Sequence, residues 1–281
     1  MPAPERIPAG AVTPPSPSDA PTLLAKGELK VLGQVREASN AVLYCEISYE
    51  GESARCVYKP VAGEQPLWDF PDGNLARREV ASYEISEATG WGLVPPTVLR
   101  DGPYGEGMCQ LWIEAREDDE DGGLLALVAD EEPAEGWKPV VLAEVAEGRT
   151  ALLVHADDAR LRRLAVLDAV INNGDRKGGH LLPADDGRLY GIDHGVTFHV
   201  DDKLRTLLWG WAGEPLPAEA VDVLRRLDED LREKAPLATR LAELVTAAEL
   251  AALRHRVTGL LTTGVHPSPS GDWPAIPWPP I

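Results

Sequence analysis

The chain has 281 residues, 44% of them hydrophobic, and a formal net charge of -19. A chain of this length can bury a large core, so it needs no disulfide or structural metal to fold. Its excess of carboxylates repels phosphate backbones and anionic lipid headgroups, because non-specific attraction to either requires clustered Lys and Arg. We therefore expect neither a nucleic acid nor a membrane surface as the partner.

The cysteines and the N-terminal residues indicate the compartment. Cys45, Cys56 and Cys109 form no C-x-x-C pair and lie inside apolar runs, which is typical of buried thiols in a reducing environment. Residues 1–21 are rich in Pro and Ala and lack both a basic leader and a continuous apolar stretch. We expect a disordered tail there, no signal peptide or membrane anchor, and a cytoplasmic protein.

Residues 22–114 are predicted to form one lobe built on a sheet. β-rich runs predict strands over 27–33, 41–47 and 54–58, and again over 91–99 and 107–114. Between the third and fourth of these strands, a helical run predicts a helix over 74–89, which Gly90 ends. Three strands, a helix and two more strands predict an antiparallel sheet with one helix packed on it.

The second half of the chain is predicted to be mostly helical. Residues 115–140 form an acidic, Gly-containing segment that we interpret as a hinge or insertion, and residues 141–265 as a helical lobe. Apolar residues at three-to-four spacing predict helices over 156–172, 217–234, 237–245 and 246–261. Residues 266–281, rich in Pro and Trp, are either disordered or docked as an extended segment.

One polar stretch of the helical lobe carries the functional groups, LDAVINNGDRKGGHLL (167–182) followed by GRLYGIDHGVTFH (187–199). Asp175 ends a polar turn directly after an apolar helix, and Asp193 directly follows a short strand. Two carboxylates at the ends of regular elements can point into one cleft, where one positions a hydroxyl and the other holds Mg²⁺ against phosphates. Turns favour Asn, Asp and Gly as well, so the prediction depends on the combination with Lys59 upstream and a Glu in the following helix.

The run NNGDRKGGH followed by IDHG resembles the catalytic and metal-binding loops of phosphatidylinositol 3- and 4-kinases and of HipA-type protein kinases. Over residues 27–213 the chain resembles an uncharacterised bacterial family that is similar to phosphatidylinositol 3- and 4-kinases. The resemblance implies an α+β, two-lobed protein-kinase-like fold, with an antiparallel-sheet small lobe and a mostly helical large lobe. It also implies an atypical kinase that uses ATP with Mg²⁺ or Mn²⁺ and phosphorylates the hydroxyl of a small molecule or a protein.

The resemblance assigns roles to the residues of both loops. Asp175 and Arg176 form the catalytic loop, with Asp175 as the catalytic aspartate, and Asp193 is the metal ligand. Where those kinases usually have an asparagine as second metal ligand, this chain has His180. Its softer imidazole can bind Mn²⁺, donate a hydrogen bond to a phosphate, or take no part in binding.

The same resemblance assigns the contacts to ATP. Lys59, in the VYKP motif, contacts the phosphates and pairs with a carboxylate of the following helix, for which Glu79 is preferred over Glu84 and Glu87.

The adenine is expected against the hinge segment QLWIE (110–114), which includes Gln110 and Trp112. Ser39 and the amides near Asn40 can donate to a phosphate, although this loop lacks the repeated glycines of a typical phosphate-covering loop.

Two further interpretations of the loops remain open. With His180 in place of asparagine, the chain can be a nucleotide-binding pseudokinase that acts as a partner module. It can also be a metal-dependent hydrolase that uses Asp175, His180, Asp193 and His194, but that interpretation leaves Lys59 unexplained.

Three residues near the loops are interpreted as structural. Asp168 shares a helical stripe with apolar residues, so we expect it to face the core and to be supported by the following turn or by Arg176. Trp209 and Trp211 flank a glycine and are expected to pack inside the lobe.

Overall fold

The computed structural model describes residues 19–35, 40–70, 72–116, 123–129, 132–146 and 149–280, with the side chains of residues 145 and 146 left aside. Contacts divide the chain into two compact units. Unit 1 comprises Met1–Gln65 and Pro96–Trp112, and unit 2 comprises Pro66–Pro95 and Ile113–Ile281. One boundary, after Trp112, falls inside the segment for which a hinge was predicted.

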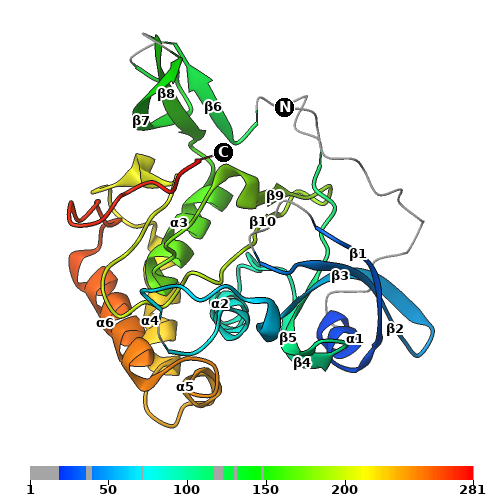
Figure 1. Cartoon of the computed structure of the whole chain (residues 1–281). Coiled ribbons are helices and arrows are strands. Elements are labelled where there is room, and N and C mark those ends of the chain that lie inside the picture. The colour runs from blue at the N-terminus through cyan, green and yellow to red at the C-terminus, as the bar shows by residue number, and fades with distance from the viewer. Residues whose placement is uncertain are drawn as a thin grey trace. The chain divides into compact units, whose positions relative to one another are not determined.

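Unit 1 is built on a five-stranded antiparallel sheet in the order β1-β2-β3-β5-β4 (Figure 1). Its strands are β1 (Glu28–Gln34), β2 (Leu43–Tyr49), β3 (Glu52–Pro60), β4 (Thr97–Gly102) and β5 (Gly105–Leu111). A short 3-10 helix, η1, follows β3 at Val61–Gly63. The antiparallel sheet expected from the sequence is therefore present.

A short helix, α1 (Ala20–Lys26), packs against the sheet of unit 1. Its Leu23 and Leu24 are buried in a cluster that contains all three cysteines, each of which is buried and free. The cysteines are thus core residues, as predicted. The expected tail over residues 1–21 lies mostly outside the described residues, and its last two residues begin α1, a helix that was not predicted.

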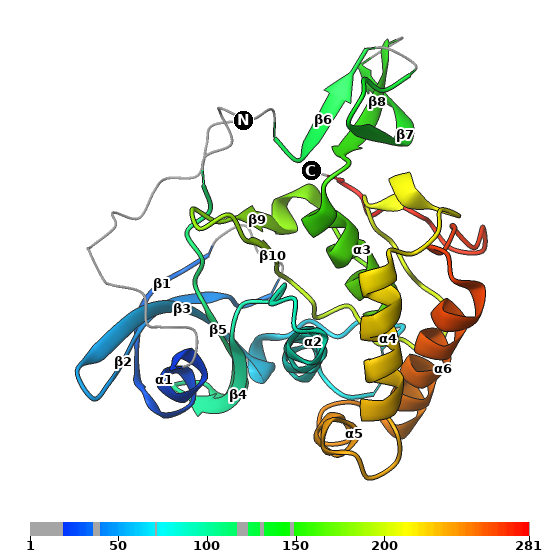
Figure 2. The same ribbon diagram turned by 180° about the vertical axis from the view of Figure 1, so that it is seen from behind.

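Unit 2 contains the four helices that the apolar periodicity predicted and also α2 (Leu75–Thr89), which was expected within the lobe of residues 22–114 but belongs to unit 2 by its contacts. The four are α3 (Ala159–Ile171), α4 (Ala218–Asp230), α5 (Pro236–Leu241) and α6 (Ala247–Thr263), with 3-10 helices η2 (Gly178–His180) and η3 (Trp209–Trp211). Helices α4 and α6 lie side by side in both ribbon views (Figure 2). Strands β9 (Leu181–Pro183) and β10 (Leu189–Gly191) form an antiparallel pair between α3 and η3 along the chain.

A three-stranded antiparallel sheet, in the order β6-β8-β7, occurs where the sequence predicted an acidic segment and the start of the helical lobe. Its strands are β6 (Leu125–Val128), β7 (Trp137–Ala146) and β8 (Arg149–Ala156). Strand β8 buries five consecutive residues, Ala151 to His155, and so does not alternate. A short apolar run without alternation does not distinguish a strand from a buried helix, which is why this sheet was missed.

The C-terminal segment docks on unit 2 in an extended form, one of the two alternatives left open. The amide of Thr206 and the indole of Trp209 both donate to the carbonyl of Ala275, at 3.1 and 2.8 Å. The amide of Gly178 donates to the carbonyl of Pro280 at 2.9 Å. Trp209 and Trp211 are buried, as expected for packing residues.

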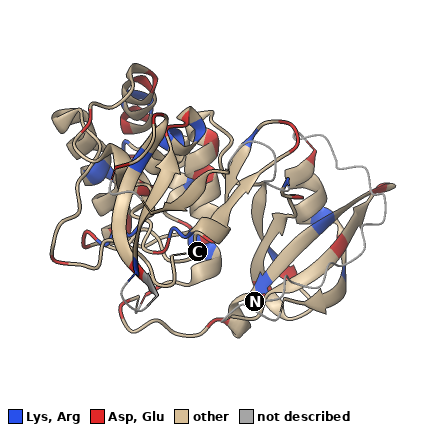
Figure 3. Ribbon diagram, turned by 90° about the horizontal axis from the view of Figure 1, so that it is seen from above, with Lys and Arg blue, Asp and Glu red and all other residues tan. Residues whose placement is uncertain are grey.

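Charges of both signs lie on the helices of unit 2 (Figure 3). In the part of the chain that the structure describes, no helix combines the length and the hydropathy needed to cross a bilayer.

Candidate active site

The loop that contains Asp175 begins where α3 ends. Asn172 caps the helix in the left-handed conformation, with a φ of 54°, a region that Asn tolerates better than most residues. Its side-chain amide donates to the carbonyls of His199 and Asp201, at 3.0 and 2.7 Å, and its Oδ1 accepts from the amide of Lys203 at 3.0 Å. The turn before Asp175 is thus tied to residues 199–203.

A buried ion pair anchors the same loop. The side chains of Asp168 and Arg176 are both 0% exposed. Arg176 Nε donates to Asp168 Oδ2 and Nη2 donates to Oδ1, each at 2.9 Å. This bidentate geometry is the strongest form of the Arg–carboxylate pair. The predicted support of Asp168 by Arg176 is confirmed.

The guanidinium of Arg176 also reaches the segment that contains Asp193. Its Nη1 donates to the carbonyl of Ile192 at 3.0 Å, and its Nη2 lies 2.6 Å from His194 Nε2. Because arginine only donates, His194 Nε2 is the acceptor. One buried side chain therefore joins the loop of Asp175 to the residues on both sides of Asp193.

Asn173 completes this framework, and its role was not predicted from the sequence. It is fully buried; its side-chain amide donates to Asp168 Oδ1 at 2.9 Å, and its Oδ1 accepts from the amide of Asp175 at 3.0 Å. An amide side chain offers a donor and an acceptor on two separate atoms, so it can serve both contacts at once. The pair of asparagines before Gly174 was the available signal, but turns favour asparagine for other reasons as well.

The carboxylate of Asp175 itself reaches solvent. Its side chain is 27% exposed, and its Oδ2 accepts from Lys177 Nζ at 2.9 Å. The framework of Asn173 and Arg176 thus holds the backbone on both sides of Asp175 while its carboxylate remains accessible.

Asp193 and His180 face each other. Asp193 has a φ of 62° and a half-exposed side chain, and its Oδ2 lies 3.4 Å from His180 Nε2. Burial lowers the pKa of His180, while the charge of Asp193 opposes this shift. The amide of Lys177 donates to His180 Nδ1 at 3.4 Å, which leaves the proton of the neutral imidazole on Nε2, toward Asp193.

This arrangement fits a divalent metal in part. The exposed carboxylate of Asp193 is a suitable oxygen ligand for Mg²⁺ or Mn²⁺, whereas His180 can coordinate through Nε2 only after that nitrogen loses its proton. Within the described ranges, no group of three or more His, Cys, Asp or Glu side chains is placed to hold a metal ion. A metal here would therefore need further ligands from phosphates or water.

Glu79, on α2, lies in unit 2 together with the loops. It is 1% exposed, and its Oε2 accepts from the amide of His194 at 2.8 Å, so it holds the residue after Asp193. The alternative Glu84 is engaged with Arg240 at 2.9 Å. Pairing of Glu79 with Lys59 joins residues of different units and stays a prediction.

The predicted phosphate-contacting residues belong to unit 1. Lys59 is half-buried in β3, opposite Met108 of β5. Asn40 Oδ1 accepts from the amide of Gln65 at 2.8 Å, and Ser39 lies outside the described residues.

The two predicted adenine-contacting residues are also in unit 1. The side chain of Gln110 is buried and donates to Thr97 Oγ1 at 2.8 Å. Trp112 is 38% exposed and packs edge-to-face on Tyr44, with ring centroids 4.9 Å apart. The structure thus brings Glu79, Asp175, Arg176, His180 and Asp193 together within unit 2. Within unit 1 it gives Gln110 a hydrogen bond and Trp112 a ring contact.

Comparison with solved structures shows a kinase-like fold. The crystal structure of the Golgi casein kinase matches with a TM-score of 0.53 and 14% identity, over 88% of this chain and 75% of that chain. The same kinase with Mn/ADP bound gives a TM-score of 0.52 over the same shares. The structure of hydra Fam20 with sugar gives a TM-score of 0.50 and 13% identity, over 86% of each chain.

Comparison of sequences adds two relatives, while no family model matches the chain. Phosphatidylinositol 4-kinase gamma 4 of Oryza sativa subsp. japonica is 25% identical over 69% of this chain, which spans only 36% of the length of that protein. Protein Rv2133c of Mycobacterium tuberculosis is 49% identical over 267 residues, which cover 93% of this chain and 95% of the relative. With identity of this degree over nearly the whole of both chains, the protein belongs to the family of Mycobacterium tuberculosis Rv2133c.

Proposed function

We propose that the protein is an ATP-dependent phosphotransferase, an atypical kinase that transfers a phosphoryl group to the hydroxyl of a small molecule or a protein. The observation that carries the proposal is the Arg176 side chain, which joins the loop of Asp175 to both neighbours of Asp193. Phosphoryl transfer depends mainly on positioning and on electrostatic stabilisation. A rigid link between the two carboxylates supplies the positioning.

In this proposal the residues of the two loops divide the work. Asp175 orients the acceptor hydroxyl and accepts its proton. Asp193 would hold Mg²⁺ or Mn²⁺, with His180 as a second ligand once its Nε2 has lost its proton, and the bound metal would supply positive charge against the phosphates. Arg176, buried and saturated with contacts, acts as a positioning residue, and Lys59 contacts the phosphates as predicted from the sequence.

Both kinds of similarity support this proposal. The fold is shared with a kinase whose crystal contains Mn/ADP, and the relative from Oryza sativa is named a phosphatidylinositol 4-kinase. We therefore propose that the catalytic loops work as those of phosphatidylinositol 3- and 4-kinases do. For the phosphoryl acceptor, we propose no more than a compound that carries a hydroxyl group.

Two contacts favour the second candidate, a nucleotide-binding pseudokinase that acts as a partner module. His180 directs its Nε2 proton at Asp193, and Lys177 neutralises Asp175. Asp193 must give up its contact with His180 before it can bind a metal, and Asp175 must give up its contact with Lys177 before it can accept a proton from a hydroxyl.

The first prediction separates these candidates. Titration calorimetry with ATP and Mn²⁺ should show metal-dependent binding that Asp193→Ala abolishes, because the oxygen ligand is lost. Asp175→Asn should retain nucleotide binding and lower ATP consumption by about 10²- to 10⁴-fold, the usual contribution of a positioned base.

The matched control is Asp186→Asn, a half-exposed carboxylate paired with Arg188 in the turn between β9 and β10. It should bind and consume ATP like the unmodified protein. Tight ATP binding without consumption under Mg²⁺ or Mn²⁺ would favour the pseudokinase, and metal-dependent binding that survives Asp193→Ala would contradict both candidates.

A further inference from the structure

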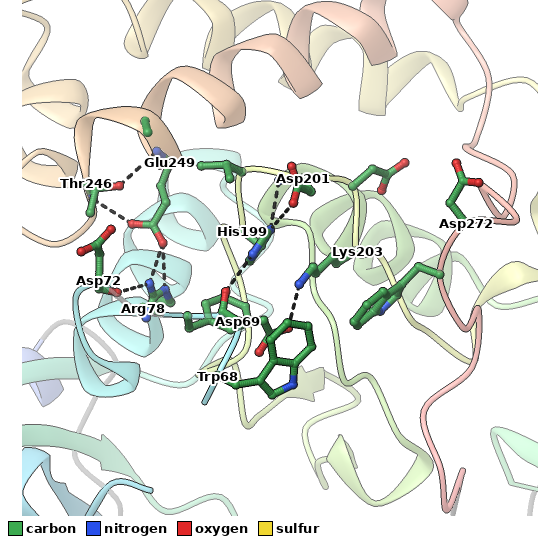
Figure 4. A pocket seen from close by; sticks show the side chains of 15 residues that line it. Trp68, Asp69, Asp72, Arg78, His199, Asp201, Lys203, Thr246, Glu249 and Asp272 are labelled. Atoms are coloured by element: carbon green, nitrogen blue, oxygen red, sulfur yellow. Dashed lines mark hydrogen bonds and ion pairs between the residues drawn. The ribbon is translucent and has the colours of Figure 1, made fainter. Parts of the chain in front are cut away.

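Unit 2 contains a cavity that the proposed phosphotransferase does not use. Its volume is about 760 Å³, within the range of small-molecule sites. The segment before α2, residues 199–203, the start of α6 and the C-terminal segment all contribute to it (Figure 4).

The lining is strongly acidic. It includes six carboxylates but only two permanent cations, and both cations are neutralised within the wall. Arg78 pairs with Glu249 at 2.6 Å, and Lys203 pairs with Asp69 at 2.7 Å.

The four remaining carboxylates, Asp72, Asp201, Asp202 and Asp272, have no ion pair with Lys or Arg among the described residues. His199 Nδ1 lies 3.8 Å from Asp201 Oδ2. Behind the wall, Arg256 donates to the carbonyl of His199 at 3.1 Å. If its positive charge is set against the four carboxylates, three negative charges remain uncompensated. The cavity therefore attracts cations.

Aromatic rings give the cavity a preference for organic cations. Lys203 Nζ lies 4.4 Å from the ring centroid of Trp273 and 5.3 Å from that of Trp68. Trp68 is nevertheless 85% exposed, and tryptophan is enriched at binding interfaces, where its indole is apolar and its N–H is polar. These rings and Asp69 already accommodate one ammonium of the chain itself, which demonstrates that ammonium groups suit this wall.

The layout of the charges indicates the shape of the ligand. In Figure 4, Asp72 lies at one end of the cavity and Asp272 at the other, with Asp201, Lys203 and Trp68 between them. A compact metal ion does not match this separation, and none of the described acidic groups is clustered as a metal site. We propose that the cavity binds a small linear di- or polyamine, with an ammonium group at each acidic end and its methylene chain along the aromatic residues.

The second prediction tests this proposal with spermidine on the full chain, by titration calorimetry and tryptophan fluorescence. One molecule should bind per chain, and 1,5-pentanediol, which lacks the charges, should not bind. Asp201→Asn combined with Asp272→Asn should weaken binding about tenfold, because two attractive charges are lost. Trp68→Ala should weaken it several-fold, and Trp68→Phe should restore most of the affinity by restoring a π face.

The matched control is Asp222→Asn combined with Glu229→Gln, which removes two charges from exposed positions on α4 outside the cavity. Equal weakening in this control would show attraction by the net charge alone and overturn the proposal. Equally tight binding of Mg²⁺ or Ca²⁺ would identify a metal site instead. Binding of a lysine-rich peptide without binding of spermidine would identify a basic protein partner. The assay measures binding only, so its outcome does not depend on the phosphotransferase activity.

Discussion

At the residue scale, the buried ion pair of Asp168 and Arg176 is the contact on which the loop of Asp175 depends most. Both side chains are withdrawn from water, which costs several kcal/mol for each ion and is compensated only by good geometry and full hydrogen bonding. Asp168 accepts from Arg176 and Asn173, while Arg176 also donates to the carbonyl of Ile192. Removing one member of this network therefore leaves a buried charge without its partner and lowers the free energy of unfolding.

The third prediction follows from that cost. Asp168→Asn should lower the free energy of unfolding by about 3–5 kcal/mol, because the guanidinium of Arg176 is left buried without its counter-charge. Urea denaturation followed by circular dichroism measures the loss. The exposed pair offers the control, since Asp186→Asn should cost less than about 1 kcal/mol.

The double variant Asp168→Leu with Arg176→Met sharpens the test. Replacing both charges removes the uncompensated ion, so it should cost less than the sum of the two single substitutions. Additive costs would show that the two side chains stabilise the fold independently.

At the scale of elements, a glycine at a helix end and a glycine inside a helix adopt different backbone conformations. Gly90 ends α2 with a φ of 73°, while Gly259 lies inside α6. An added Cβ would meet no atom within 4 Å at either position. The two glycines therefore differ in backbone conformation and not in available space.

The fourth prediction is a pair of substitutions with opposite signs. Gly90→Ala should destabilise the protein by about 1–2 kcal/mol, the cost of a left-handed residue that has a Cβ. Gly259→Ala should stabilise it by about 0.5–1 kcal/mol, since alanine loses less entropy in a helix. Thermal unfolding of both variants provides the comparison, and a shift of the same sign in both would refute the conformational argument.

For the whole molecule, a buried histidine links folding to pH. His266 is 3% exposed, and its Nε2 accepts from Arg162 Nε at 3.1 Å. Burial, together with the charge of Arg162, lowers the pKa of His266 from 6.5 to about 4. The unfolded chain therefore binds a proton at a higher pH than the folded protein does, and acidification favours unfolding.

The fifth prediction states the pH window. The contribution of His266 is fully present above pH 6.5 and is lost as the pH falls toward 4, by up to roughly 3 kcal/mol. His266→Gln keeps an acceptor for Arg162 and does not titrate, so its unfolding free energy should fall less across this window. Urea denaturation from pH 7 to pH 4 measures the difference, and parallel curves for the two proteins would contradict the assignment.

Local sequence patterns predicted the parts of the fold that rest on local physics. Apolar periodicity located helices α3 to α6, and β-rich runs located the strands of unit 1, because side-chain spacing reports which face is buried. The order of Lys59, Asp175 and Asp193 together with the resemblance pointed to a kinase-like protein, and the fold comparison shows a kinase-like fold. The same patterns did not reveal the sheet of β6, β7 and β8, because its central strand β8 buries consecutive residues and does not alternate.

The sequence by itself determined which residues could carry the chemistry, since residue type and order are enough to mark Asp175, Asp193 and His180 as candidates. Only the tertiary structure decided how these residues are held. It shows Arg176 bridging the two loops, Asn173 bonded to Asp168, and the acidic cavity assembled from four separate segments. The physical reason is that such contacts join residues far apart along the chain, and each depends on the positions of elements that no local pattern encodes.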